Sequence, residues 1–161
     1  MTVPDDRPLR IRIEATDLPG LTWPPGPDSP GRDNVHVGVQ RKDSPGELTG
    51  LHPADAASVS WTLDCTAVST PEGVEVSGPY VQHRMGGRFV YLSWGTVDGT
   101  GLFSMFRRAK LMMADVGPDV LGAAMRSGRL TARLRLSDGA GRPRCARVRP
   151  PDVVWSAEEG T

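Results

Sequence analysis

Cysteine and lysine are almost missing from this 161-residue chain. The two cysteines, Cys65 and Cys145, lie far apart and outside any Cys-x-x-Cys pair, so neither a metal site nor a disulfide framework is indicated. We expect both thiols to be reduced and packed. The two lysines are Lys42 and Lys110, and every other basic residue is an arginine.

The chain also lacks a net charge and a long apolar run. Its 19 basic residues balance 19 acidic ones, so no overall field favours nucleic acid or an anionic membrane. No apolar segment approaches the roughly 18 residues of a membrane-spanning helix, and the N-terminus lacks the pattern of a secretory signal. We therefore expect no nucleic-acid partner, no membrane association and a cytoplasmic location.

The length of the chain predicts a single domain over residues 1–161, large enough to bury roughly two-thirds of its unfolded surface. Proline and glycine are frequent in residues 17–34, which predicts a long loop. Within that loop, Trp23 either pins the loop to the core or lines a ligand pocket. A short flexible tail is expected from residue 156 onward.

Alternation of apolar and polar residues predicts a series of strands. They cover about residues 8–14, 35–39, 58–67, 74–76, 89–94 and 130–136, a basic segment that ends near Arg149, and a short edge strand at 153–155. The segment 89–94 is apolar on both faces, which is typical of a central strand. A loop is expected at 42–57 and turns at 85–88 and 138–141, the second of which would join 130–136 and the basic segment into a hairpin.

The period changes to that of a helix in residues 102–116. One stripe holds Leu102, Met105, Phe106, Ala109, Met112, Met113 and Val116, which predicts an amphipathic helix. Gly117 can end this helix, and Pro118 can open a short second helix that ends at Gly128. The pattern predicts an α+β fold: a curved, mostly antiparallel sheet, or half-barrel, packed on one amphipathic helix plus a short second helix. A closed small barrel is the alternative.

Six strings that occur in order along the chain resemble the hallmarks of a family of small uncharacterised proteins from actinobacteria. The strings are LRIRIEATDLPG, NVHVGVQRK, GPYVQHR, RFVYLSWGTVDG, MFRRAKLMM and CARVRPP. The resemblance extends from Leu9 to Trp155 and implies a cytoplasmic protein of one domain. It implies no activity, cofactor or catalytic residue.

Polar and aromatic side chains are densest between Gly78 and Met113. The weak candidates for acid–base chemistry are His83, Tyr80 and Tyr91. The candidate ligand-binding residues are Trp23, Arg84, Trp94, Arg107 and Lys110, which would combine aromatic surface with cations able to hold a carboxylate or phosphate. No nucleophile elbow, metal-ligand spacing or phosphate loop accompanies them, so no metal or cofactor is predicted.

Two classes of function remain open at this point. The first is a binding domain for a small organic ligand, which the nearby cations would allow to be anionic, or for a protein partner. The second is a cofactor-free enzyme of the isomerase or cyclase type, in which Tyr80, His83 and Tyr91 would transfer protons and Arg107 would hold an anionic group.

Overall fold

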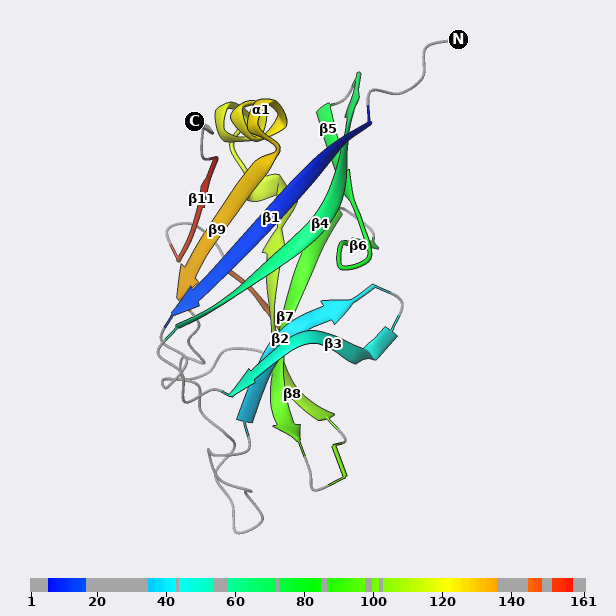
Figure 1. Ribbon diagram of the computed structural model, residues 1–161, viewed down its shortest axis with the longest axis vertical. Helices are drawn as coiled ribbons and strands as arrows, with labels where there is room; N and C mark the ends of the chain where they lie inside the picture. The colour runs from blue at the N-terminus through cyan, green and yellow to red at the C-terminus, as the bar shows by residue number, and fades with distance from the viewer. Residues whose placement is uncertain are drawn as a thin grey trace.

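Two β-sheets pack around one hydrophobic core in the computed structural model (Figure 1). The structure describes residues 6–16, 35–42, 44–53, 58–71, 73–84, 87–97, 100–101, 103–135, 145–148 and 152–157. Both sheets contribute buried side chains to the core, such as Ile11 from one and Leu92 from the other. The predicted loop at 17–34, the turn at 138–141 and the end of the tail lie outside the described residues.

Sheet A holds the first strand of the chain at its centre. In spatial order its strands are β11 (Val153–Ser156), β9 (Arg129–Arg135), β1 (Asp6–Thr16), β4 (Ser58–Thr70) and β5 (Gly73–Ser77). The β1 strand pairs antiparallel with β4 and parallel with β9. Sheet A is a curled half-barrel of largely antiparallel strands, which confirms the predicted curved sheet.

Sheet B is built around the strand that the sequence predicts to be central. Its order is β10 (Cys145–Arg147), β8 (Phe103–Met112), β7 (Gly87–Val97), β2 (Val35–Arg41) and β3 (Ser44–Pro53). A three-residue strand, β6 (Gln82–Arg84), also pairs with β7. All of these pairings are antiparallel except that of β8 with β10.

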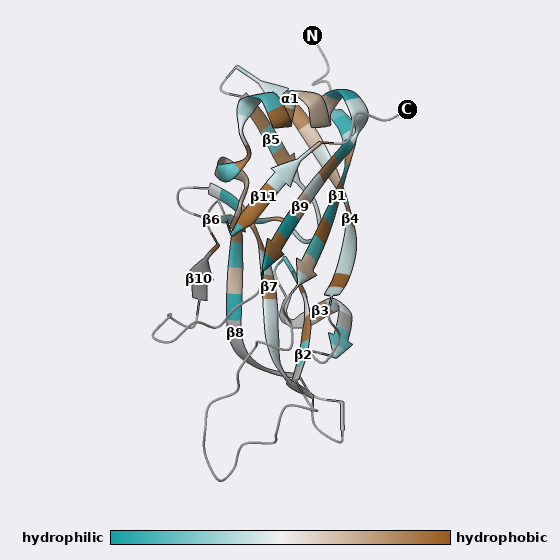
Figure 2. Ribbon diagram, turned by 90° about the vertical axis from the view of Figure 1, so that its left-hand side faces the viewer, coloured by the Kyte–Doolittle hydropathy of each residue, from teal (hydrophilic) through white to brown (hydrophobic). Residues whose placement is uncertain are grey.

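Alternation of apolar and polar residues along the strands of sheet A directs one face into the core. On β1, Leu9, Ile11 and Ile13 are buried, whereas Arg10 and Arg12 are exposed on the opposite face. Figure 2 shows the same alternation of hydrophilic and hydrophobic residues along β9. The outer face of sheet A is therefore polar, as expected for a sheet that is covered on one side.

One α-helix, α1 (Pro118–Ser127), lies at the end of sheet A where β9 begins (Figure 1). Pro118 occupies the first turn, where its missing N–H costs nothing, and Gly128 ends the helix in the left-handed conformation at φ 76°. The Gly128 carbonyl accepts a hydrogen bond from the Arg10 backbone N–H at 2.9 Å, which ties the helix end to β1. The predicted short second helix is thus confirmed.

The predicted amphipathic helix at 102–116 is wrong. Residues 103–112 form the strand β8, and a 3-10 turn, η3 (Met113–Asp115), follows it. Ala109 and Leu111 are buried, while Arg108, Lys110 and Met112 between them are only half-buried. Alanine, methionine, lysine and arginine all favour helices locally, but hydrogen bonding to β7 and β10 on either side outweighs that small preference.

Three further predictions about strand pairing need correction. The predicted hairpin from 130 to 149 does not form, because β9 lies in sheet A and β10 in sheet B. The predicted loop at 42–57 contains the strand β3 (Ser44–Pro53) instead. Both sheets keep open edges among the residues described, so the closed-barrel alternative is also wrong.

A tryptophan and a glycine connect the two sheets directly. The indole N–H of Trp61 on β4 donates a 2.7 Å hydrogen bond to the Gly50 carbonyl on β3. Gly50 has φ 59°, and a Cβ atom placed there would lie 2.6 Å from the Trp61 ring. The contact therefore requires glycine both for its backbone conformation and for its lack of a side chain.

Replacing Gly50 by alanine should destabilise the fold more than replacing a glycine that also has a positive φ but has open space around it. Gly101 supplies that control, because it has φ 85° and nothing within 4 Å of an added Cβ. We expect Gly50→Ala to lower the free energy of unfolding by about 1–3 kcal/mol more than Gly101→Ala, since overpacking adds to backbone strain. Chemical denaturation measures both; equal losses would show that the indole moves aside freely.

Candidate functional site

The central strand of sheet B is buried on both of its faces. Val90, Leu92 and Trp94 pack into the core between the sheets. Phe89, Tyr91 and Ser93 face the other way, yet they are only 3%, 6% and 1% exposed. The prediction that residues 89–94 form a central strand covered on both faces is therefore confirmed.

Two cations from β8 lie over the aromatic rings of β7. Tyr91 is opposite Lys110 and Ser93 is opposite Arg108 in the antiparallel register, which places all four on one face of the sheet. The Arg108 guanidinium lies 4.6 Å from the Tyr91 ring centre, and the Lys110 ammonium lies 4.5 Å from that of Phe89. The two rings touch edge to face, with centres 4.8 Å apart. The two distances between a cation and a ring centre are within the range of favourable cation–π contacts.

Two glutamines from neighbouring strands complete this face. The side-chain carbonyl of Gln40 on β2 accepts hydrogen bonds from the Ser93 hydroxyl at 3.3 Å and from Arg108 at 3.4 Å. Gln82 on β6 is opposite Phe89 and is 5% exposed. Its amide nitrogen has no hydrogen-bond partner in the part of the chain that the structure describes, although a buried donor without a partner costs about 1–3 kcal/mol.

We call this set the cation–aromatic face. Its members are Gln40, Gln82, Phe89, Tyr91, Ser93, Arg108 and Lys110. No acidic residue within the described ranges forms an ion pair with Arg108 or Lys110. Within the described part of the chain, these two adjacent positive charges contact aromatic rings and an amide carbonyl but no carboxylate, so the face can accept a negative charge.

Three of the sequence-predicted residues lie on the outer side of sheet B. Tyr91 and Lys110 belong to the cation–aromatic face itself. Arg84 is exposed at the end of β6, two residues from Gln82, and side chains two apart on a strand share a face. The structure thus places Tyr91, Arg84 and Lys110 on one side of sheet B.

The other predicted residues lie elsewhere. Trp94 is buried in the core, and Tyr80 is half-buried against the same core. His83 is exposed and opposite Arg88, whose guanidinium contacts Glu75 and the Val76 carbonyl of β5 in sheet A. His83 therefore lies on the opposite side of β6 and β7 from Tyr91, and the three acid–base candidates do not form one site.

The side chains of two predicted residues lie outside the described part of the chain. Trp23 lies outside the described residues. Arg107 is opposite Trp94 in the β8 backbone, but its side chain lies outside the described part.

Arg108 is the partner of Lys110 on this face, and the sequence pattern alone does not predict this pair. On a helix the two residues fall on different sides of the apolar stripe, whereas on a strand residues two apart point the same way. The signal that could have found the pair was the alternation of Arg108, Lys110 and Met112 with the buried Ala109 and Leu111. Gln40 and Ser93 offered no signal, because polar residues on a strand normally face water.

Clusters of metal ligands and membrane-spanning helices are both absent from the described ranges. No group of three or more His, Cys, Asp or Glu side chains in these ranges could hold a metal ion. Across those same residues, no helix has the length and apolar character required to cross a membrane.

Comparison with known families gives one match. Residues 9–158 match the model of a family of unknown function, DUF5990. This confirms the resemblance to an uncharacterised family that the six strings indicated. No curated protein and no solved structure matches the chain.

Proposed function

The chain belongs to DUF5990, a family of unknown function, and we propose that it is a binding domain that holds a small organic anion on the cation–aromatic face. One observation carries the proposal. Arg108 and Lys110 lie side by side over the rings of Tyr91 and Phe89, and no carboxylate of the described chain pairs with them. An anion from outside would supply the missing negative charge.

The chemistry of the face favours an anion that also has an organic part. Aromatic rings provide apolar contact area, and the cations provide charge-assisted hydrogen bonds, which are about twice as strong as neutral ones. The buried Gln82 amide nitrogen is a donor still without a described partner, and an oxygen of the ligand would satisfy it. Pockets that combine apolar walls with a few convergent polar groups are typical of small-molecule sites.

Two observations support this reading over the alternatives. Val154 is the one large hydrophobic side chain among the described residues that is exposed, so an apolar interface with a protein partner has little support. His83 and Tyr91 lie on opposite sides of their strand pair, so proton transfer between them has little support either. Binding without catalysis is the simpler proposal.

We also propose that the protein works in the cytoplasm. Cys65 is a free, buried thiol, and free thiols are typical of reducing compartments. This location would also give access to the many organic anions of metabolism.

The two lysines provide a matched pair of variants for a test. Benzoate, which combines one ring and one carboxylate, is the probe, and its binding is followed by chemical shifts of the backbone amides. We expect Lys110→Ala to weaken benzoate binding about tenfold, the equivalent of about 1.4 kcal/mol for one lost charge-assisted contact. Lys42→Ala removes the same charge from an exposed position and should leave binding unchanged.

Two controls separate this result from a general charge effect. Lys110→Arg keeps the cation and should retain binding, while benzyl alcohol has the ring without the charge and should not bind. Shift changes should be centred on Tyr91 and the neighbouring strands. Equal weakening in Lys42→Ala and Lys110→Ala, or shifts on sheet A alone, would contradict the proposal.

A further inference from the structure

Arginines are concentrated on the outer face of sheet A, on the two strands that pair in parallel. The five arginines there are Arg10 and Arg12 on β1 and Arg129, Arg133 and Arg135 on β9. The chain as a whole has no net charge, so this positive charge is local. Register and ion pairing show that its two ends are not alike.

One end of this surface contains a carboxylate that pairs with its arginines. Glu14 is opposite Arg133 in the parallel register, and its two carboxylate oxygens accept 2.8 Å hydrogen bonds, one from Arg133 and one from Arg12. The hydrogen bond from Arg133, assisted by that from Arg12, holds the pKa of Glu14 below its usual value. Both guanidinium groups, Arg12 and Arg133, therefore already have an anionic partner at this end.

The other end contains a pair of like charges. Arg10 is directly opposite Arg129, and like charges in direct opposition destabilise a sheet. Arg10 contacts Asp64 at 3.3 Å, but both side chains are largely exposed, so this pair contributes little. The Arg129 guanidinium has no ion pair or side-chain hydrogen bond within the part of the chain described.

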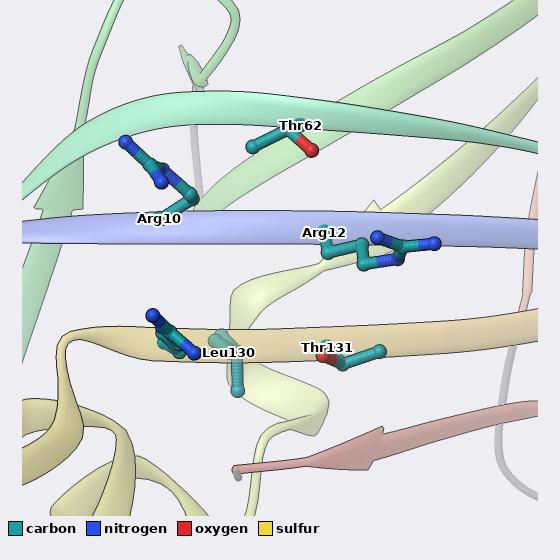
Figure 3. A pocket seen from close by; sticks show the side chains of 6 residues that line it. Arg10, Arg12, Thr62, Leu130 and Thr131 are labelled. Carbon is teal, nitrogen blue, oxygen red and sulfur yellow. The ribbon is translucent and has the colours of Figure 1, made fainter. Parts of the chain in front are cut away.

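A groove lies at this like-charged pair. Its volume is about 240 Å³, and it is lined by Arg10, Arg12, Thr62, Arg129, Leu130 and Thr131. In Figure 3, Arg10 and Arg12 on β1 lie between Thr62 on β4 and Thr131 on β9. A second hollow of about 490 Å³ shares Arg10 and Arg129 with the first and extends toward Ser127 and Gly128 at the end of α1.

We propose that this groove binds the phosphate group of a small phosphomonoester. A phosphate carries roughly 1.5–2 negative charges at neutral pH and has three terminal oxygens, which would neutralise both Arg10 and Arg129. Each guanidinium fork matches two phosphate oxygens, and the hydroxyls of Thr62 and Thr131 are further donors in the same wall.

The surroundings indicate a small ligand rather than a polyanion. Beyond the groove, Arg12 and Arg133 already share Glu14 as an anionic partner, so these two arginines are less available to a long polyanion. The neighbouring hollow provides space for the organic part of the ligand beside Pro8 and Leu9. The site lies on sheet A, apart from the cation–aromatic face on sheet B, so it does not depend on the function proposed above.

Titration calorimetry with inorganic phosphate and with glycerol phosphate, at constant ionic strength, tests the site. We expect glycerol phosphate to bind more tightly than inorganic phosphate, and Arg129→Ala to weaken its binding at least tenfold. Arg41→Ala, which removes an exposed arginine from sheet B, is the matched control and should bind normally. Lys110→Ala should also bind glycerol phosphate normally, and Arg129→Ala should still bind benzoate.

A stability measurement shows that the variant remains folded. Without phosphate and at low ionic strength, Arg129→Ala should melt no lower than the wild type, because it loses a like-charge contact. Addition of glycerol phosphate should then raise the Tm of the wild type more than that of the variant. Equal binding by Arg129→Ala and wild type, equal affinity for inorganic phosphate and the ester, or tighter binding of a single-stranded oligonucleotide would each overturn the assignment.

Discussion

Replacing Leu111 by alanine should lower the free energy of unfolding by about 2–5 kcal/mol, which is the usual cost of removing a fully buried leucine side chain. Leu111 is 0% exposed on β8 and belongs to the core. Its neighbour Met112 is half-buried on the outer side of the same strand, so Met112→Ala should cost clearly less. Urea denaturation of the two variants gives the comparison.

This pair of variants separates the strand from the helix that the local pattern predicts. On the helix, Met112 falls on the apolar stripe and Leu111 falls outside it, so the order of the two losses would be reversed. A larger loss for Met112→Ala than for Leu111→Ala would therefore contradict the pairing of β8 with β7. The far-ultraviolet circular dichroism of both variants should keep the spectrum of the wild type.

The thiol of Cys65 should react with iodoacetamide about 100-fold more slowly in the folded protein than in the unfolded chain at pH 8. Burial, with a smaller contribution from the charge of Asp64, raises the pKa of Cys65 from 9.0 to about 11. Two units reduce the thiolate fraction about 100-fold, and the thiolate is the reactive form. The measurement is made on Cys145→Ser, so that Cys65 is the single thiol.

The same shift has a consequence for stability at high pH. The folded state holds the Cys65 proton more tightly than the unfolded state does, so the unfolded thiol ionises first as the pH rises. Stability from this residue is present below about pH 9 and is lost as the pH approaches about 11. Cys65→Ala should remove this part of the pH dependence. A folded-state alkylation rate within a fewfold of the unfolded rate would show that the thiol is not buried.

Most strands could be predicted because their alternation is strict. In the central parts of β1 and β4 every second side chain is buried. A period of two residues is typical of a strand with one face in the core. The strand β3 escaped prediction because Pro45, Gly46, Gly50 and Pro53 give it the composition of a loop. Its pairing with β2 tolerates them at the edge of the sheet, where the register is already irregular.

The pairing of strands could not be predicted from periodicity. Alternation indicates that a segment is a strand, but it does not show which strand it pairs with. The segment 130–136 is therefore predicted to pair with the strand that follows it in the sequence. In the structure its neighbours are β1 and β11. The candidate site is limited in the same way. The sequence nominates Lys110 and Tyr91, whereas Arg108 needs the correct register on β8 and Gln40 needs the contact of β2 with β7.

The central place of β1 in sheet A has a consequence for the newly made chain. Glu14 on β1 and Arg133 on β9 pair in the sheet although they are 119 positions apart in the sequence. At a synthesis rate of about 5–20 residues per second, β9 emerges roughly 6–24 s after β1. During that interval the edge of β1 that β9 will occupy has no strand beside it. Charged side chains on an unpaired edge oppose association with other chains. Arg10, Arg12 and Glu14 on β1 therefore protect the unfinished chain before they form part of the finished surface.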